Sequence, residues 1–162
     1  MYKVAIITAS DKGYAGERED KSGSVIEEIV TAHELEVTGK VILPDDRQML
    51  SDQMLNYCHQ GIDLILTTGG TGFSKRDVTP EATADIVERR ADNLTFAMIA
   101  NSLQYTPKAM LSRGIAGIRE NTLIVNLPGS PNAVRENLEY AIDAIIHGVK
   151  ILKGDDAECA RK

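Results

Sequence analysis

The sequence predicts a three-layer α/β/α fold with a mostly parallel, mixed sheet and a small antiparallel hairpin. Two observations carry this prediction. Apolar runs of strand character alternate along the chain with segments whose apolar residues recur at helical spacing, as is typical of α/β proteins. Two short apolar runs, 115–119 and 122–127, are separated only by Glu120 and Asn121, and this spacing favours a hairpin and hence a mixed sheet.

In the first half of the chain, three strands and two helices are expected. The predicted strands cover residues 4–9, 36–43 and 62–68, and the predicted helices cover 24–33 and 46–61. Ser24 followed by Glu27 fits a capping box at the start of the first helix, and Asp46 is a candidate cap for the second. The segment 10–23 is too polar for a regular element and is interpreted as a loop over the carboxyl end of the first strand.

In the second half, three more helices flank the hairpin. Thr79 is the expected N-cap of a helix over 81–90, with a proline in its first turn. Another helix is expected over 94–105, and Ser130 is the expected N-cap of the last one. The predicted inner face of the last helix consists of Val134, Leu138, Ala141, Ile142, Ile145, Ile146 and Val149.

The 162-residue length predicts one domain, residues 1–154, followed by a polar C-terminal tail, residues 155–162. The sequence has no apolar run long enough to span a membrane. It enters a strand-like run at once and lacks the features of a signal peptide, so we expect a cytoplasmic location and no membrane partner.

The formal net charge of −6 argues against a general nucleic-acid-binding protein, because phosphate contacts need clustered Lys and Arg. A small anionic substrate remains compatible, with help from a divalent cation, backbone donors or a few basic residues. The two cysteines, Cys58 and Cys159, are far apart and show no metal-type spacing, so we expect no structural metal.

The most informative segment is 64–82, where an apolar run breaks into glycines and leads to Asp77 and a helix start. Glycines just past a strand let backbone N–H groups approach a ligand without an intervening Cβ. In an open α/β sheet, ligands bind beyond the carboxyl ends of the strands. The segment therefore predicts a site for a phosphate-bearing ligand, with Asp77 placed to hold a metal ion beside it.

Several familiar catalytic motifs are absent from the sequence. The glycine segment is neither a P-loop nor a dinucleotide fingerprint, since residue 75 is Lys, and the chain has no Gly-x-Ser-x-Gly motif. The histidines, His33, His59 and His147, lie in predicted helices without ligand spacing. Chemistry that needs only positioning and charge stabilisation, such as phosphoryl or nucleotidyl transfer, fits best.

Six segments of the chain together carry a resemblance to a known family. They are 10–12, 44–46, 67–72, 76–81, 112–114 and 127–131, the last closely followed by Arg135 and Glu136. The most specific of them is the glycine segment followed by Arg-Asp-Val-Thr-Pro-Glu. Through these segments the chain resembles the MogA/MoaB family of molybdenum-cofactor biosynthesis proteins over nearly its whole length, with Lys12 where the family has Arg.

The resemblance implies the fold of that molybdopterin-binding domain and the activity of a molybdopterin adenylyltransferase. Such an enzyme transfers AMP from ATP to the terminal phosphate of molybdopterin and releases pyrophosphate. The resemblance also implies a homotrimer and hand-off of the product to a MoeA-like protein that inserts molybdate. It does not separate MogA-like from MoaB-like members, or a molybdenum from a tungsten cofactor.

Asp45 and Asp77 are the candidate catalytic residues and the candidate ligands of Mg²⁺, which binds carboxylates and substrate phosphates. Asp45 resembles the second essential carboxylate of the family. The alternative for Asp77 is a carboxylate that orders its own loop. The alternative for Asp45 is a turn residue, and Asp46 could exchange roles with it.

The candidate substrate-binding residues divide into two groups. Gly69, Gly70, Thr71 and Gly72 are expected to cradle phosphate, with Lys75 and Arg76 either adding charge or lying in solvent. The other candidates rest on the resemblance, supported for Ser130 by the helix N-terminus it caps, and they are Ser10, Asp11, Ser112, Pro128, Gly129 and Ser130. Two alternative functions are a non-catalytic molybdopterin carrier and a Mg²⁺-dependent nucleotide pyrophosphatase.

Overall fold

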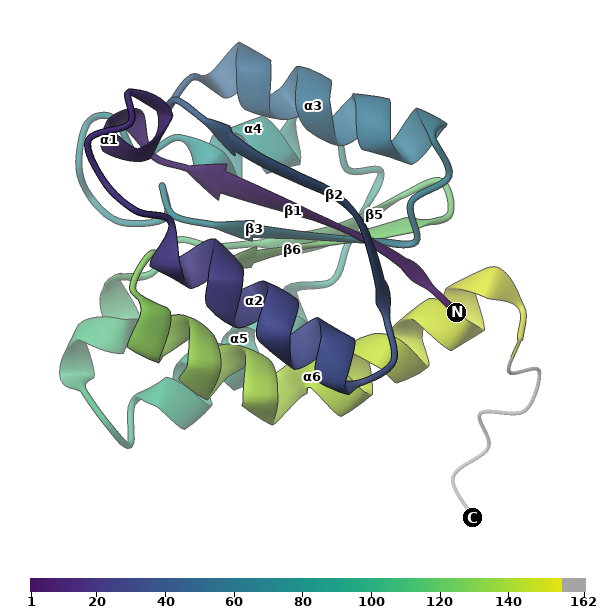
Figure 1. Cartoon of the computed structure of the whole chain (residues 1–162). Helices are drawn as coiled ribbons and strands as arrows, with labels where there is room; N and C mark the ends of the chain where they lie inside the picture. The colour runs from purple at the N-terminus through teal and green to yellow at the C-terminus, as the bar shows by residue number, and fades with distance from the viewer. Residues whose placement is uncertain (156–162) are drawn as a thin grey trace.

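The computed structural model describes residues 1–155, which form a sheet between two helical layers (Figure 1). This arrangement confirms the predicted α/β/α fold. The strands are β1 (Lys3–Ala9), β2 (Glu36–Leu43), β3 (Leu64–Thr68), β4 (Arg89–Arg90), β5 (Ala116–Arg119) and β6 (Thr122–Leu127). The helices are α1 (Asp11–Tyr14), α2 (Lys21–Ala32), α3 (Arg47–His59), α4 (Thr79–Ala84), α5 (Asp92–Ser102), the 3₁₀ helix η1 (Pro107–Leu111) and α6 (Pro131–Lys153).

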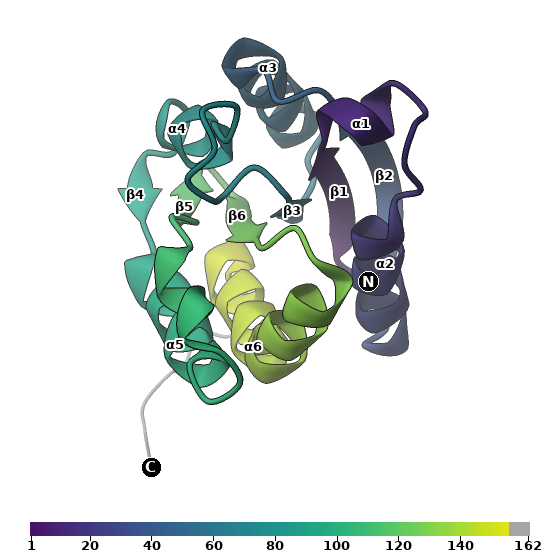
Figure 2. The same ribbon diagram turned by 90° about the vertical axis from the view of Figure 1, so that its left-hand side faces the viewer.

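The sheet has the strand order β2-β1-β3-β6-β5-β4. The first four of these strands are parallel, whereas β5 runs antiparallel to β6 and β4 antiparallel to β5. Because β5 runs the opposite way, its beginning lies at the same edge as the carboxyl ends of the parallel strands. Figure 2 looks onto this edge, with the arrowheads of β1 and β6 toward the viewer.

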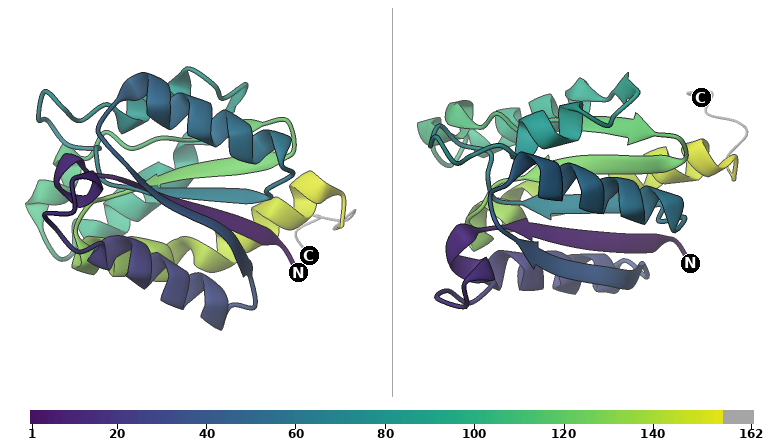
Figure 3. Two further views of the ribbon diagram at one scale, coloured as in Figure 1. Left: turned by 45° about the horizontal axis from the view of Figure 1, so that its top comes forward. Right: turned by 90° about the horizontal axis from the view of Figure 1, so that it is seen from above.

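Two apolar cores lie on the two faces of the sheet. Helices α2, α5 and α6 cover one face, and α3 and α4 cover the other (Figures 1 and 3). Alternate residues of β1 enter the two cores, since Val4 and Ile6 contact the first and Ala5 and Ile7 the second. A central parallel strand buried on both faces explains why this segment is almost continuously apolar.

The structure confirms two of the expected helix starts. The Asp46 carboxylate accepts a hydrogen bond from the backbone N–H of Met49 at 2.8 Å, and the Ser130 hydroxyl accepts one from Ala133 at 3.2 Å. The expected capping box at Ser24 is wrong. Helix α2 begins three residues earlier, because Asp20 caps it by accepting from the N–H of Gly23.

Four other expectations are wrong in the type of element or in its bounds. The polar segment 10–23 is not a plain loop, since it contains α1 and the first turn of α2. The helix expected over 81–90 ends at Ala84, and Arg89–Arg90 instead pairs with β5 as the outermost strand. The N-cap of α4 is Val78, so Thr79 is its first helical residue. The strand expected from residue 62 begins at Leu64.

The end of α6 closes the described part of the chain. All of its predicted inner face is buried except Ile146, which is partly buried against the same core. Gly154 follows the helix in a left-handed conformation, with φ of 77°. Residues 156–162 of the predicted tail, including Cys159, lie outside the described residues. No helix within residues 1–155 is long and apolar enough to cross a membrane.

Candidate active site

A polar cleft of about 910 Å³ opens at the carboxyl edge of the parallel strands. Its walls come from the segments that follow β1, β2, β3 and β6, the edge seen in Figure 2. The predicted site residues that line it are Ser10, Asp11, Asp45, Gly69, Gly70, Asp77, Gly129 and Ser130.

The glycine loop packs directly against its neighbours. Gly69 has φ of +88°, and a Cβ there would clash with the carbonyl oxygen of Ala9 at the end of β1. Gly70 has φ of +67°, and a Cβ there would clash with the Thr79 hydroxyl and lie 3.1 Å from Oδ1 of Asp45. These two positions therefore require glycine both for their backbone conformation and for space.

Asp45 and Asp11, which both line the cleft, are joined by two reciprocal hydrogen bonds. The N–H of Asp11 donates to Oδ2 of Asp45 at 3.1 Å, and the N–H of Asp45 donates to Oδ1 of Asp11 at 3.0 Å. Oδ1 of Asp45 is buried and has no hydrogen-bond partner. Burial raises the pKa of Asp45; the N–H of Asp11 opposes this, while the negative charges of Asp11 and Asp77 add to it.

Asp77 faces the same cleft and also orders its own loop. Its Oδ2 accepts a hydrogen bond from the N–H of Ser74 at 3.0 Å, and its own N–H donates to the carbonyl of Ser74 at 3.0 Å. Asp77 therefore orders its own loop, as the alternative interpretation of the sequence proposed. This hydrogen bond uses Oδ2 of Asp77, so the other carboxylate oxygen is still available to a ligand.

A fork-shaped ion pair connects two walls of the cleft. Arg76 donates to both carboxylate oxygens of Asp11, from Nε at 3.0 Å and from Nη2 at 2.9 Å. This pair lowers the pKa of Asp11. Arg76 lines the cleft, whereas Lys75 does not. The two basic residues that the sequence grouped together therefore differ in their access to a ligand.

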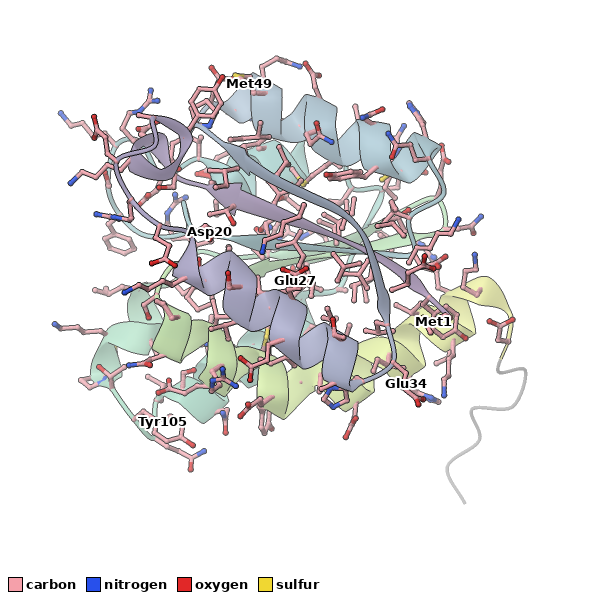
Figure 4. All side chains as sticks on the ribbon, in the orientation of Figure 1. Met1, Asp20, Glu27, Glu34, Met49 and Tyr105 are labelled. Atoms are coloured by element: carbon pink, nitrogen blue, oxygen red, sulfur yellow. The ribbon has the colours of Figure 1, made fainter. Side chains whose placement is uncertain are left out.

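The N-termini of two long helices also open onto the cleft. Ser130 and Pro131 bring the start of α6, while Asp20 and Lys21 bring the start of α2. Figure 4 labels Asp20, whose Oδ2 also accepts from the hydroxyl of Thr8 at 2.8 Å. Helix N-termini favour anions, so this end of the sheet suits a phosphorylated ligand.

Sequence reasoning missed part of the cleft wall. Asp20 was hidden in the segment interpreted as a loop, although an Asp before a helical run is a usual cap signal. Further cleft residues that the sequence analysis did not single out as site residues include Thr8, Lys12, Arg18, Glu19, Asp20, Lys21, Ser22, Thr68 and Ser74.

A second, smaller hollow of about 310 Å³ lies beside the cleft, between α5, η1 and the start of α6. The remaining predicted residues line this hollow and not the cleft, namely Thr71, Gly72, Ser112 and Pro128, and Ser130 lines both. Met98, Ile99 and Leu111 make much of its wall apolar. The hydroxyl of Ser102 in the same wall is buried without a hydrogen-bond partner.

The residues of the cleft fit a cation that completes its coordination with ligand oxygens. Within residues 1–155 no group of three or more His, Cys, Asp or Glu side chains is placed to hold a metal ion. Mg²⁺ in phosphate-binding sites usually takes one or two carboxylates together with substrate phosphates. Oδ1 of Asp45, buried and unpartnered beside Gly70, is a ligand atom of the required kind.

Known proteins are similar to the chain along nearly its whole length. Residues 5–147 match the profile of a family described as "Probable molybdopterin binding domain". A molybdopterin adenylyltransferase of Helicobacter pylori is 37% identical over 155 residues, covering 94% of this chain and 88% of that protein. A gephyrin of Dictyostelium discoideum is 40% identical over 159 residues, and there the match covers 92% of this chain but only 22% of the relative.

Solved structures give the same result for the fold. The molybdopterin biosynthesis enzyme MoaB from Thermus thermophilus has a TM-score of 0.90 and 42% identity, over 95% of this chain and 98% of that one. The tungsten cofactor synthesizing protein MoaB from Pyrococcus furiosus has a TM-score of 0.86 and 34% identity, over 94% of this chain and 97% of that one.

Proposed function

The chain belongs to the family of probable molybdopterin-binding domains, and on this premise we propose that it is a molybdopterin adenylyltransferase. It would transfer AMP from ATP to the phosphate of molybdopterin and release pyrophosphate. The observation that carries the proposal is the pair Asp45 and Asp77, which face one polar cleft beside a glycine loop. Relatives that match along most of their length bear the same enzyme name.

The polar cleft is the proposed site of the nucleotide phosphates. Mg²⁺ held by Asp45 and Asp77 would neutralise charge on the phosphates. The backbone around Gly69 and Gly70 would approach the ligand closely, and the N-termini of α2 and α6 would favour its negative charge. Catalysis of this kind needs positioning and electrostatic stabilisation more than a protein nucleophile.

The smaller hollow is the proposed site of the pterin ring. Its volume of about 310 Å³ and its partly apolar wall suit one flat heterocycle, and the unpartnered hydroxyl of Ser102 offers a hydrogen bond to a polar ring atom. Because Ser130 borders both hollows, a pterin here would extend its phosphate toward the nucleotide.

The direct test combines purified protein, ATP, Mg²⁺ and molybdopterin, and follows adenylylated pterin and pyrophosphate by chromatography. We expect both products in equal amounts, and only when pterin is present. ATP consumption without pterin would support a nucleotide pyrophosphatase instead. Tight pterin binding without any product would support a carrier. Omission of Mg²⁺ tests the metal requirement in the same assay.

We also propose that the protein is a cytoplasmic homotrimer that hands its product to a MoeA-like partner. Support for self-association comes from large apolar side chains left exposed on α5, on α6 and on the segment between them. They include Phe96, Leu103, Tyr105, Met110, Leu111 and Tyr140, and Tyr105 is labelled in Figure 4. Light scattering at micromolar concentration tests the trimer, and a monomeric mass would refute it.

A further inference from the structure

Arg113 lies in the segment that joins η1 to β5, and it contacts residues of both hollows without lining either one. This segment reaches the site because β5 is antiparallel and begins at the edge where the parallel strands end. The N–H of Arg113 donates to the carbonyl of Thr71 at 2.8 Å, and its neighbours Ser112 and Gly114 line the smaller hollow. The main chain of the segment between η1 and β5 is therefore hydrogen-bonded to the glycine loop.

The side chain of Arg113 holds both ends of the loop that carries Asp77. Its Nε donates to the carbonyl of Gly72 at 2.8 Å, and its Nη2 donates to the carbonyl of Asp77 at 2.8 Å. Nη1 contacts the carboxylate of Glu81 in the first turn of α4. Between the two carbonyls, residues 73–76 are all exposed.

We propose that Arg113 is a positioning residue that sets the location of the Asp77 carboxylate in the cleft. Fixing the backbone of an exposed loop costs conformational entropy at every residue, so four exposed residues stay in one place only if strong contacts hold both ends of the loop. The planar guanidinium reaches three acceptors at fixed angles, which a lysine ammonium cannot reproduce. The ion pair with Glu81 in turn fixes the orientation of the guanidinium.

The first arm of the test is limited proteolysis and does not depend on the proposed function. The loop contains Lys75 and Arg76, two trypsin sites. Arg113→Lys should raise the cleavage rate at these sites at least tenfold relative to cleavage elsewhere in the chain, as followed by mass spectrometry. Unchanged cleavage would overturn the proposal, and so would an equal increase at all sites, because that indicates general unfolding.

Arg119→Lys is the matched control. Arg119 also contacts a carbonyl, that of Ile86 at 3.3 Å, and a carboxylate, that of Glu88 at 3.5 Å, and it lines neither hollow. We expect this variant to leave cleavage at Lys75 and Arg76 unchanged. Faster cleavage of the loop in the control would also overturn the proposal.

The second arm measures AMP transfer and rests on the proposed function. A displacement of about 1 Å at a reacting group costs on the order of 10²-fold in rate. Arg113→Lys should therefore lower kcat about that much and raise the Mg²⁺ concentration for half-maximal rate, while Glu81→Gln has a smaller effect in the same direction. A looser loop with an unchanged rate and Mg²⁺ dependence would overturn the positioning role. An inactive wild-type protein would count against the proposed function alone.

Discussion

The two ends of the sheet differ in the hydrogen bonds that they give to an aspartate that is at least partly buried. At the amino edge, Asp63 precedes β3, and its carboxylate accepts from the N–H of Lys3 and from Nζ of Lys153, both at 2.8 Å. At the carboxyl edge, Asp45 has one carboxylate oxygen buried without a partner and lies near two further acidic residues, Asp11 and Asp77.

This difference separates a stabilising carboxylate from one that we propose is kept available for a ligand. A buried polar atom normally has a hydrogen bond, because an unsatisfied one costs about 1–3 kcal/mol. Asp63 follows this rule and joins the start of β1 to the end of α6. Asp45 departs from it, and such departures are expected where a fold gives up stability for function.

The largest expected effect is the loss of AMP transfer at the carboxyl edge. Asp77→Ala should lower kcat by at least about 10²–10³-fold, the usual range for removing one stabilising group at a reacting centre, with the fold and trimer intact. Asp77→Asn sharpens the result, because its amide oxygen still accepts from Ser74 while the charge is lost. If Asp77→Asn keeps normal turnover in a steady-state assay, Asp77 only orders its loop.

The matching change at the amino edge should affect stability and leave activity unchanged. Asp63→Ala removes the acceptor of Lys3 N–H and the partner of Lys153, so we expect a loss of about 1–3 kcal/mol in the free energy of unfolding. Urea denaturation measures this loss. Asp52→Ala, at an exposed side chain that accepts from Gln48, is the control and should change little. A drop in kcat for Asp63→Ala would contradict the division between the two edges.

A smaller effect, of opposite sign, is expected from neutralising the other carboxylate. Asp45→Asn removes a partly buried charge near Asp11 and Asp77 but keeps an acceptor for the N–H of Asp11. The variant should lose AMP transfer and gain stability at neutral pH. A gain of about 1 kcal/mol would raise the Tm by about 2–4 °C in calorimetry. A lower Tm would mean that the Asp45 charge stabilises the free protein.

The smallest expected effect is the pH dependence of the stability that Asp45→Asn gains over the wild type. Since burial raises the pKa of Asp45 in the folded protein, the folded state keeps this proton to higher pH than the unfolded chain does. Wild-type stability must then fall, relative to Asp45→Asn, as pH rises from the ordinary aspartate pKa to the raised one, and the deficit stays constant above it. Thermal scans of both proteins across this pH interval test whether the wild type loses stability relative to Asp45→Asn as pH rises. A Tm difference between the two proteins that becomes smaller as pH rises would show that the pKa of Asp45 is not raised by folding.

Local signals in the sequence predicted much of the fold and part of the site. Asp46 and Ser130 cap their helices as expected, because capping depends only on the next three residues. The glycine loop lies at the carboxyl edge because a strand and its following loop are contiguous. The strand at Arg89–Arg90 was missed, since two exposed arginines carry no apolar pattern and pair only in the context of β5.

The division of the site into two hollows was beyond the sequence. It depends on where α5 and η1 lie against the start of α6, which no local pattern specifies. Arg113 was visible as part of a matching segment, but its contacts with Gly72, Asp77 and Glu81 span 32 to 41 positions of sequence. Long-range hydrogen bonds of this kind follow from the folded backbone and not from residue type.

The tight contact between Gly69 and the end of β1 limits how this protein can evolve. Every single-base change in a glycine codon that alters the residue introduces a Cβ or stops the chain. At Gly69 such a Cβ meets the main-chain carbonyl of Ala9, which cannot rotate away as a side chain can. A library of all point variants should therefore show position 69 as intolerant as a catalytic residue, although glycine has no side chain that could take part in the reaction, and a homologue with another residue there should carry a displaced first strand.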